Sequence, residues 1–190
     1  MSRRFIAFLT VLAALLAVAP AASAGDHKDK DSWGSYRATT LDVDPGTLEA
    51  LGSLGVTPGA VDPATLEGAR YSFPVVNRLG NAVRTGVVRH TGGISLTAGD
   101  TTVELTGFEI NLAEKLLYGK VNGAGPVALL DLDYSHLKIR FNGDRLKVGP
   151  VGTTLTQGAA DALNTAFGTD ALSDDTVIGD AKIRYRVFPW

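Results

Sequence analysis

Short segments of alternating apolar and polar residues, separated by turns rich in glycine and asparagine, constrain the fold of this sequence more than any other feature. A period of two residues is typical of β-strands that bury one face. Long helical periods do not interrupt these segments, so the pattern predicts a mainly β fold: an antiparallel β-sandwich or flattened barrel with two short helices. The expected strands are residues 71–75, 87–90, 93–97, 102–106, 108–112, 116–121, 127–132, 137–141, 146–148 and 183–187.

Two turn and bulge signals add detail to this expectation. Asn142-Gly143 lies between two alternating runs, and this dipeptide is the strongest local signal of a β-hairpin. The apolar positions change parity at Gly107, which predicts a β-bulge that keeps both halves of the segment facing the core. The predicted core residues are Val103, Leu105, Phe108, Ile110, Leu130, Leu132, Ile139 and Ile183.

Two stretches show helical spacing. Asp44 is a helix-capping residue, and Pro45 after it suits the first helical position. Leucines then recur at helical spacing, which predicts a helix over residues 45–54. Thr156 precedes a second apolar face that ends at a glycine, which predicts a helix over residues 157–167.

The amino-terminal region has the three parts of a secretory signal peptide: a basic start with Arg3 and Arg4, an apolar run and small residues up to Ala24. The apolar run is shorter than the roughly 20 residues that span a bilayer, so we do not expect an integral membrane protein. The sequence predicts a signal peptide (1–24) cleaved near Ala24–Gly25, a flexible polar lead-in (25–39) and a single β-rich domain (40–190). We expect a secreted protein, extracellular or cell-wall associated, exported by the general or the twin-arginine route.

Composition excludes several classes of chemistry. The chain has no cysteine, which in an oxidising compartment excludes disulfides, thiolate catalysis and cysteine metal sites. Loss of Arg3 and Arg4 leaves 16 basic and 20 acidic residues, and 16 − 20 gives a formal charge of −4. Such a surface does not favour nucleic-acid binding. His27, His90 and His136 have no metal-ligand spacing, so we predict no metal site.

Charged side chains on alternating strands are the remaining candidates for chemistry. Asp131 and Asp133 leave the same face of one strand, and two carboxylates about 7 Å apart suit an inverting hydrolase. The alternative is an ordinary solvated strand face. Two basic stripes also occur, one over 136–140 and one over 182–186. If their strands are neighbours, that face attracts a carboxylate- or phosphate-bearing ligand, and otherwise it serves solubility.

The segment 84–96, with its continuation over 102–110, resembles the central block of HtaA-type domains, which occur in secreted and surface proteins of actinobacterial haem uptake. A Gly-x-Val strand there leads into a His/Gly turn and two further strands. The strand at 129–133 and the segment 153–163 fit the same family. The resemblance covers about Tyr71 to Phe167, in pattern more than in identity.

The resemblance implies haem, or another small anionic ligand, as the bound molecule. In the family a tyrosine from an aromatic serine-phenylalanine segment binds haem iron, and Tyr71-Ser72-Phe73 is the loose counterpart here. His90 lies beside the position of the family's turn histidine, because the glycine spacing differs. The implied cofactor-binding residues are therefore Tyr71 and His90, with Arg89 or His90 steadying a tyrosinate. A domain that kept the scaffold and lost this site is the alternative.

Three functions follow from these observations. The first is a secreted, non-enzymatic binding module of the HtaA-like type. The second is a cell-envelope structural or interaction protein with an envelope partner and no small ligand. The third is a secreted hydrolase with dispersed carboxylates. The sequence lacks the motifs of common catalytic nucleophiles, which favours the first two.

Overall fold

The structure is a computed structural model that describes residues 37–186. The predicted signal peptide and the lead-in up to residue 36 lie outside the described residues. The strands are β1 (Ala38–Val43), β2 (Thr57–Val61), β3 (Thr65–Glu67), β4 (Arg70–Pro74), β5 (Val87–Arg89), β6 (Gly93–Ala98), β7 (Thr101–Asn111), β8 (Leu116–Val121), β9 (Ala124–Asp133), β10 (Lys138–Asn142), β11 (Arg145–Leu155) and β12 (Val177–Arg186). The helices are α1 (Pro45–Ser53), α2 (Leu79–Thr85) and α3 (Gln157–Phe167).

The described strands form one sheet that curls into a flattened, nearly closed barrel. Its order is β2-β6-β7-β8-β9-β11-β12-β1-β4-β3, with β10 paired to β11 and β5 paired to β7. Every pairing is antiparallel. An isolated bridge between Val75 and His90 joins the end of β4 to the residue after β5, which brings distant parts of the sheet together. The predicted fold class is thus confirmed.

The helices confirm two predictions and correct one. Asp44 accepts hydrogen bonds from the first turn of α1, and Thr156 caps α3 in the same way. The prediction of two helices is wrong, because α2 is a third. Its N-cap residue, Arg78, makes no side-chain capping bond, so α2 lacks the local signal that identified the other two.

The strands also depart from the sequence pattern in places. β1, β2 and β3 were not among the expected strands, and β1 begins at Ala38, before the predicted domain boundary. The expected bulge occurs in β7, where the register with β8 shifts around Gly107 and this glycine has a φ of +62°. Ile139 was predicted to lie in the core, which is wrong: it is 61 % exposed, because its strand β10 pairs only with β11.

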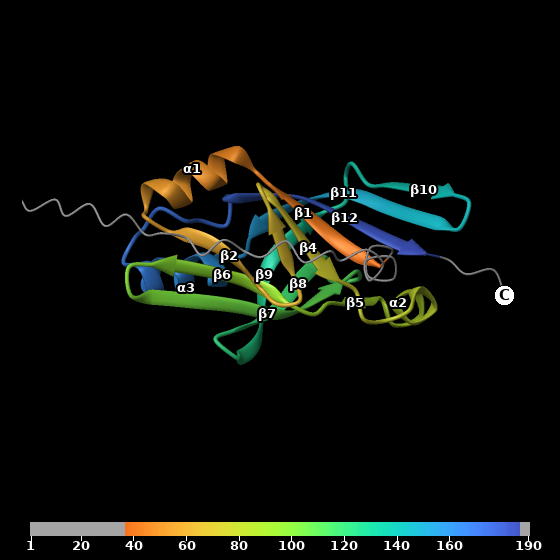
Figure 1. Cartoon of the computed structure of the whole chain (residues 1–190), viewed down its shortest axis with the longest axis horizontal. Coiled ribbons are helices and arrows are strands. Elements are labelled where there is room, and N and C mark those ends of the chain that lie inside the picture. The colour runs from red at the N-terminus through yellow and green to blue at the C-terminus, as the bar shows by residue number, and fades with distance from the viewer. Residues whose placement is uncertain (1–36, 187–190) are drawn as a thin grey trace, which may run out of the picture.

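A wall of aromatic side chains crosses the interior of the barrel. The rings of Phe73 and Phe108 meet edge to face with centroids 5.2 Å apart, and Tyr71 stacks on Phe73 at 5.7 Å. Helices α1 and α3 lie at one end of the long axis, whereas α2 and the β10–β11 hairpin lie at the other (Figure 1). The wall therefore separates two ends of the core.

No helix in the part of the chain that the structure describes is long and apolar enough to cross a membrane.

Candidate functional site

Each end of the barrel holds an apolar cavity. The cavity beside α2, here the α2 cavity, has a volume of about 510 Å³. The cavity between α1 and α3, here the α1–α3 cavity, has a volume of about 960 Å³. Phe73 and Phe108 line both. Both volumes lie within the range of about 300–1,000 Å³ that is typical of small-molecule sites.

The α2 cavity is apolar and opens to solvent. No charged side chain is among its described lining residues, and its polar ones are Thr39, His90, Tyr134, Thr153 and Tyr185. Large apolar side chains at its rim are exposed: Val83 by 73 %, Ile139 by 61 % and Phe141 by 69 %. Exposed apolar groups gathered around one opening favour a ligand or partner that covers them.

His90 lies in the wall of this cavity with both ring nitrogens bonded. Its Nδ1 lies 3.1 Å from the Phe108 carbonyl oxygen, and its Nε2 lies 2.6 Å from Thr39 Oγ1. A carbonyl oxygen only accepts, so Nδ1 carries the proton and Nε2 of the neutral ring accepts from the threonine hydroxyl. Burial lowers the pKa of His90 to about 4, so the ring is neutral at ordinary pH.

Two tyrosine hydroxyls in the cavity wall have no partner within the described residues. They belong to Tyr134, which follows β9, and to Tyr185 on β12. Burial raises the pKa of Tyr185 to about 12, and the positive charge of Arg37 opposes that rise. Burial also raises the pKa of Tyr134. Buried hydroxyls in folded proteins nearly always form hydrogen bonds. Two unpartnered hydroxyls in one cavity therefore indicate that a polar group of a ligand binds there.

Tyr185 lies near the Thr39–His90 pair. Thr39 pairs with Ile183 across β1 and β12, so Tyr185, two residues along, is its diagonal neighbour on the same face. Diagonal neighbours have Cβ atoms about 7–8 Å apart, within reach of a tyrosine side chain.

Tyr71 occupies a different place. It lines the α1–α3 cavity, and its hydroxyl donates to the Gly59 carbonyl oxygen at 3.1 Å. Burial raises its pKa to about 12. The two residues that the resemblance pointed to, Tyr71 and His90, therefore line different cavities. The sequence contained one signal for Tyr185, since it follows Ile183 on the apolar side of an alternating strand.

The carboxylate pair on β9 does not have the features of a hydrolase. A hydrogen bond from the Ser135 hydroxyl, then one from its backbone N–H, lowers the pKa of Asp133. A general acid needs a raised pKa, so Asp133 serves as a turn cap instead. The 37–186 region contains no group of three or more His, Asp or Glu side chains suited to a metal ion.

Comparison with solved structures identifies the fold. Haem-binding protein HtaB from Corynebacterium glutamicum superposes with a TM-score of 0.57 at 11 % identity, covering 77 % of this chain and 90 % of that chain. The C-terminal domain of HtaA from the same organism gives 0.54 at 13 % identity, covering 79 % and 96 %. No protein-family model and no curated protein matches the sequence. The chain therefore has the fold of HtaA-type domains, as the resemblance implied.

Proposed function

We propose that this protein is a haem-binding module and that the α2 cavity is its haem site. The fold is shared with HtaB, which is a haem-binding protein. The cavity has a suitable volume, an apolar wall and an exposed apolar rim. Haem is a largely apolar macrocycle with an iron centre and two carboxylates at one edge, so it requires apolar walls, a few polar groups that fix its orientation and an opening that leaves the carboxylates in water.

The unpartnered hydroxyl of Tyr185 is the observation that carries this proposal. An orphan hydroxyl in a buried site costs about 1–3 kcal/mol of stability, which a bound ligand removes if it bonds the oxygen. When bound, ferric haem supplies a Lewis-acidic iron that accepts a phenolate oxygen. Burial raises the pKa of the free Tyr185 hydroxyl to about 12, and the nearby positive charge of Arg37 opposes that rise, so the bond to iron must supply most of the stabilisation of the phenolate. We therefore assign the iron ligand to Tyr185.

His90 is the second candidate for the same role. Its Nδ1–H already donates to a backbone carbonyl, which is how metal-bound imidazoles are oriented. Its Nε2 must first release the Thr39 hydroxyl, whereas the Tyr185 hydroxyl has no bond to lose among the described residues. This difference favours the tyrosine.

A haem titration followed at the Soret band tests the function and the ligand together. We expect saturable binding by the wild-type protein and an affinity at least about tenfold lower for Tyr185→Phe, which corresponds to about 1.4 kcal/mol. Tyr71→Phe is the matched control, since it removes a hydroxyl from the other cavity, and we expect unchanged affinity. Equal loss in both variants would place the ligand elsewhere.

Absence of a saturable shift in the wild-type protein overturns the haem proposal. The envelope protein without a small ligand then becomes the better interpretation. Haem binding requires no catalytic group, so we propose a non-enzymatic role. Export also remains a proposal, and it rests on residues 1–24. Amino-terminal sequencing of secreted material should begin near Gly25, and a chain that retains Met1 would refute it.

A further inference from the structure

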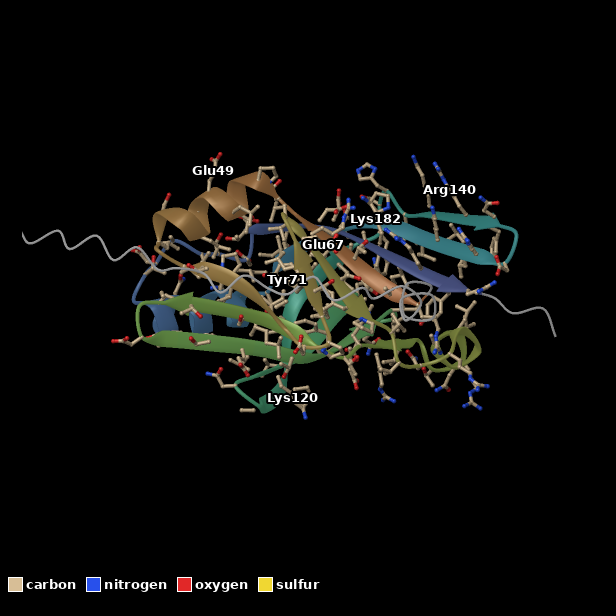
Figure 2. The ribbon with its side chains drawn as sticks, viewed as in Figure 1. Glu49, Glu67, Tyr71, Lys120, Arg140 and Lys182 are labelled. Atoms are coloured by element: carbon tan, nitrogen blue, oxygen red, sulfur yellow. The ribbon has the colours of Figure 1, made fainter. Side chains whose placement is uncertain are left out.

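The two basic stripes of the sequence belong to one surface. Strands β10 and β12 both pair with β11, so their cations lie on three adjacent strands. Alternate residues of these strands line the α2 cavity, and the basic residues between them therefore project from the opposite face. Arg140 and Lys182 are on this outward side in Figure 2. We name this surface the basic face; its residues are Lys138, Arg140, Arg145, Lys147, Lys182, Arg184 and Arg186.

Like charges are directly opposed at the centre of the basic face. Arg140 pairs with Lys147, and Lys147 pairs with Arg184, which places three cations in one row across the strands. Directly opposed like charges destabilise a sheet. These three side chains form no ion pair with any acid in residues 37–186, whereas Lys182 pairs with Asp42. The row therefore does not serve the stability of the fold.

The charge of the basic face contrasts with that of the whole chain. Its seven cations and the two acids that pair with them, Asp42 with Lys182 and Asp144 with Arg186, give 7 − 2 = +5. The entire chain has a formal charge of −2. Concentration of positive charge on one face of an acidic protein indicates an anionic partner.

We propose that the basic face docks the protein onto an anionic lipid surface. The cations form a grid about 4.8 Å apart across the strands and about 7 Å apart along them, which suits a two-dimensional array of phosphate headgroups. Strands β10, β11 and β12 also carry the exposed Ile139 and Phe141. Both residues belong to the edge strand β10 and lie at the mouth of the α2 cavity. Docking through the basic face leaves the mouth of the α2 cavity, on the other side of the sheet, free of the lipid.

The geometry favours lipid over nucleic acid. Single-stranded nucleic acids bind where aromatic rings stack on bases beside the cations. The aromatic residues of strands β10 to β12 are Phe141 and Tyr185. They line the α2 cavity, on the other side of the sheet from the basic face. A phosphate surface without base stacking fits this arrangement better.

Vesicle co-sedimentation of the mature chain tests the proposal. We expect the protein to bind vesicles containing phosphatidylglycerol, to bind pure phosphatidylcholine vesicles at least about tenfold more weakly, and to dissociate as salt is raised. The double variant K138E/K147E should lose at least about tenfold in affinity for the anionic vesicles. K115E/K120E changes the same charge in the β7–β8 hairpin, outside the three strands of the basic face, and should bind within about twofold of wild type. Lys120 lies on the side of the molecule opposite Arg140 (Figure 2).

Three results would overturn the proposal: no preference for anionic vesicles, an equal loss in both double variants, or binding of polyphosphate in solution without binding of vesicles. Circular dichroism of K138E/K147E should match wild type, which excludes misfolding as the cause of its loss. The haem titration of that variant should be unchanged, because its substitutions face away from the α2 cavity. Failure of lipid docking is thus distinguishable from failure of haem binding.

Discussion

Acidification should weaken this fold through His90. The imidazole is neutral and buried, with a pKa of about 4 in the folded protein against an ordinary value of 6.5. A group whose folded pKa is depressed stabilises the fold above its unfolded pKa, and that stabilisation is lost as pH falls toward the folded pKa. The window for this effect therefore extends from about pH 6.5 down to about pH 4.

The size of the effect follows from the two pKa values. At pH 5 the unfolded imidazole is almost fully protonated, whereas only about a tenth of the folded rings carry the proton. Between pH 7 and pH 5 the free energy of unfolding should fall by about 2 kcal/mol from this group alone. Asp42, Asp133 and Asp144 have pKa values below 3.8, so they contribute little in this interval.

Urea unfolding at pH 7 and pH 5, followed by far-ultraviolet circular dichroism, measures the loss. His90→Gln is the comparison variant, because the glutamine amide can form hydrogen bonds but does not change its charge between pH 7 and pH 5. Whatever its absolute stability, its free energy of unfolding should fall by about 2 kcal/mol less than that of wild type over this interval. Equal losses in the two proteins would refute the neutral, buried imidazole and the tautomer derived from it.

Three further predictions concern the cavity and the packing. Tyr185→Phe should raise the stability of the haem-free protein by about 1 kcal/mol in chemical unfolding, because it removes an orphan hydroxyl, and a loss of stability would indicate a hidden partner. Haem affinity should rise about tenfold per pH unit between pH 6 and 9 if a phenolate binds iron, and a flat profile would favour His90. Gly93→Ala should lower the free energy of unfolding by about 1–3 kcal/mol, because its Cβ would lie 2.2 Å from the Leu105 carbonyl oxygen. Gly52→Ala on α1 has open space around its Cβ and should stabilise the protein. Equal unfolding midpoints for the two variants would contradict this.

The alternation of apolar and polar residues predicted the fold class, because such a pattern arises when one side of a sheet is buried. The parity change at Gly107 located a bulge for the same reason. Alternation does not reveal whether the apolar side is covered. Ile139 and Phe141 share a face with buried residues of β11, yet their strand extends over the mouth of a cavity, and both are exposed. Their exposure depends on what lies opposite, which local pattern does not encode.

The candidate site depends on contacts that no local motif specifies. Thr39 and His90 are 51 residues apart, and the bridge between Val75 and His90 brings them together. Tyr185 joins them only through the pairing of β12 with β1. Tyr71 was the candidate that the sequence offered, but it precedes Phe73 by two residues on β4. That spacing, about 7 Å along a strand, places it on the side of Phe73 that faces the α1–α3 cavity.

A crystal structure of the protein with bound haem is the most direct test of the proposed site. It should show the macrocycle in the α2 cavity, with iron bonded to the Tyr185 oxygen and the Thr39–His90 hydrogen bond retained. Haem in the α1–α3 cavity with iron bonded to Tyr71, or haem held only on the outer surface, would contradict it.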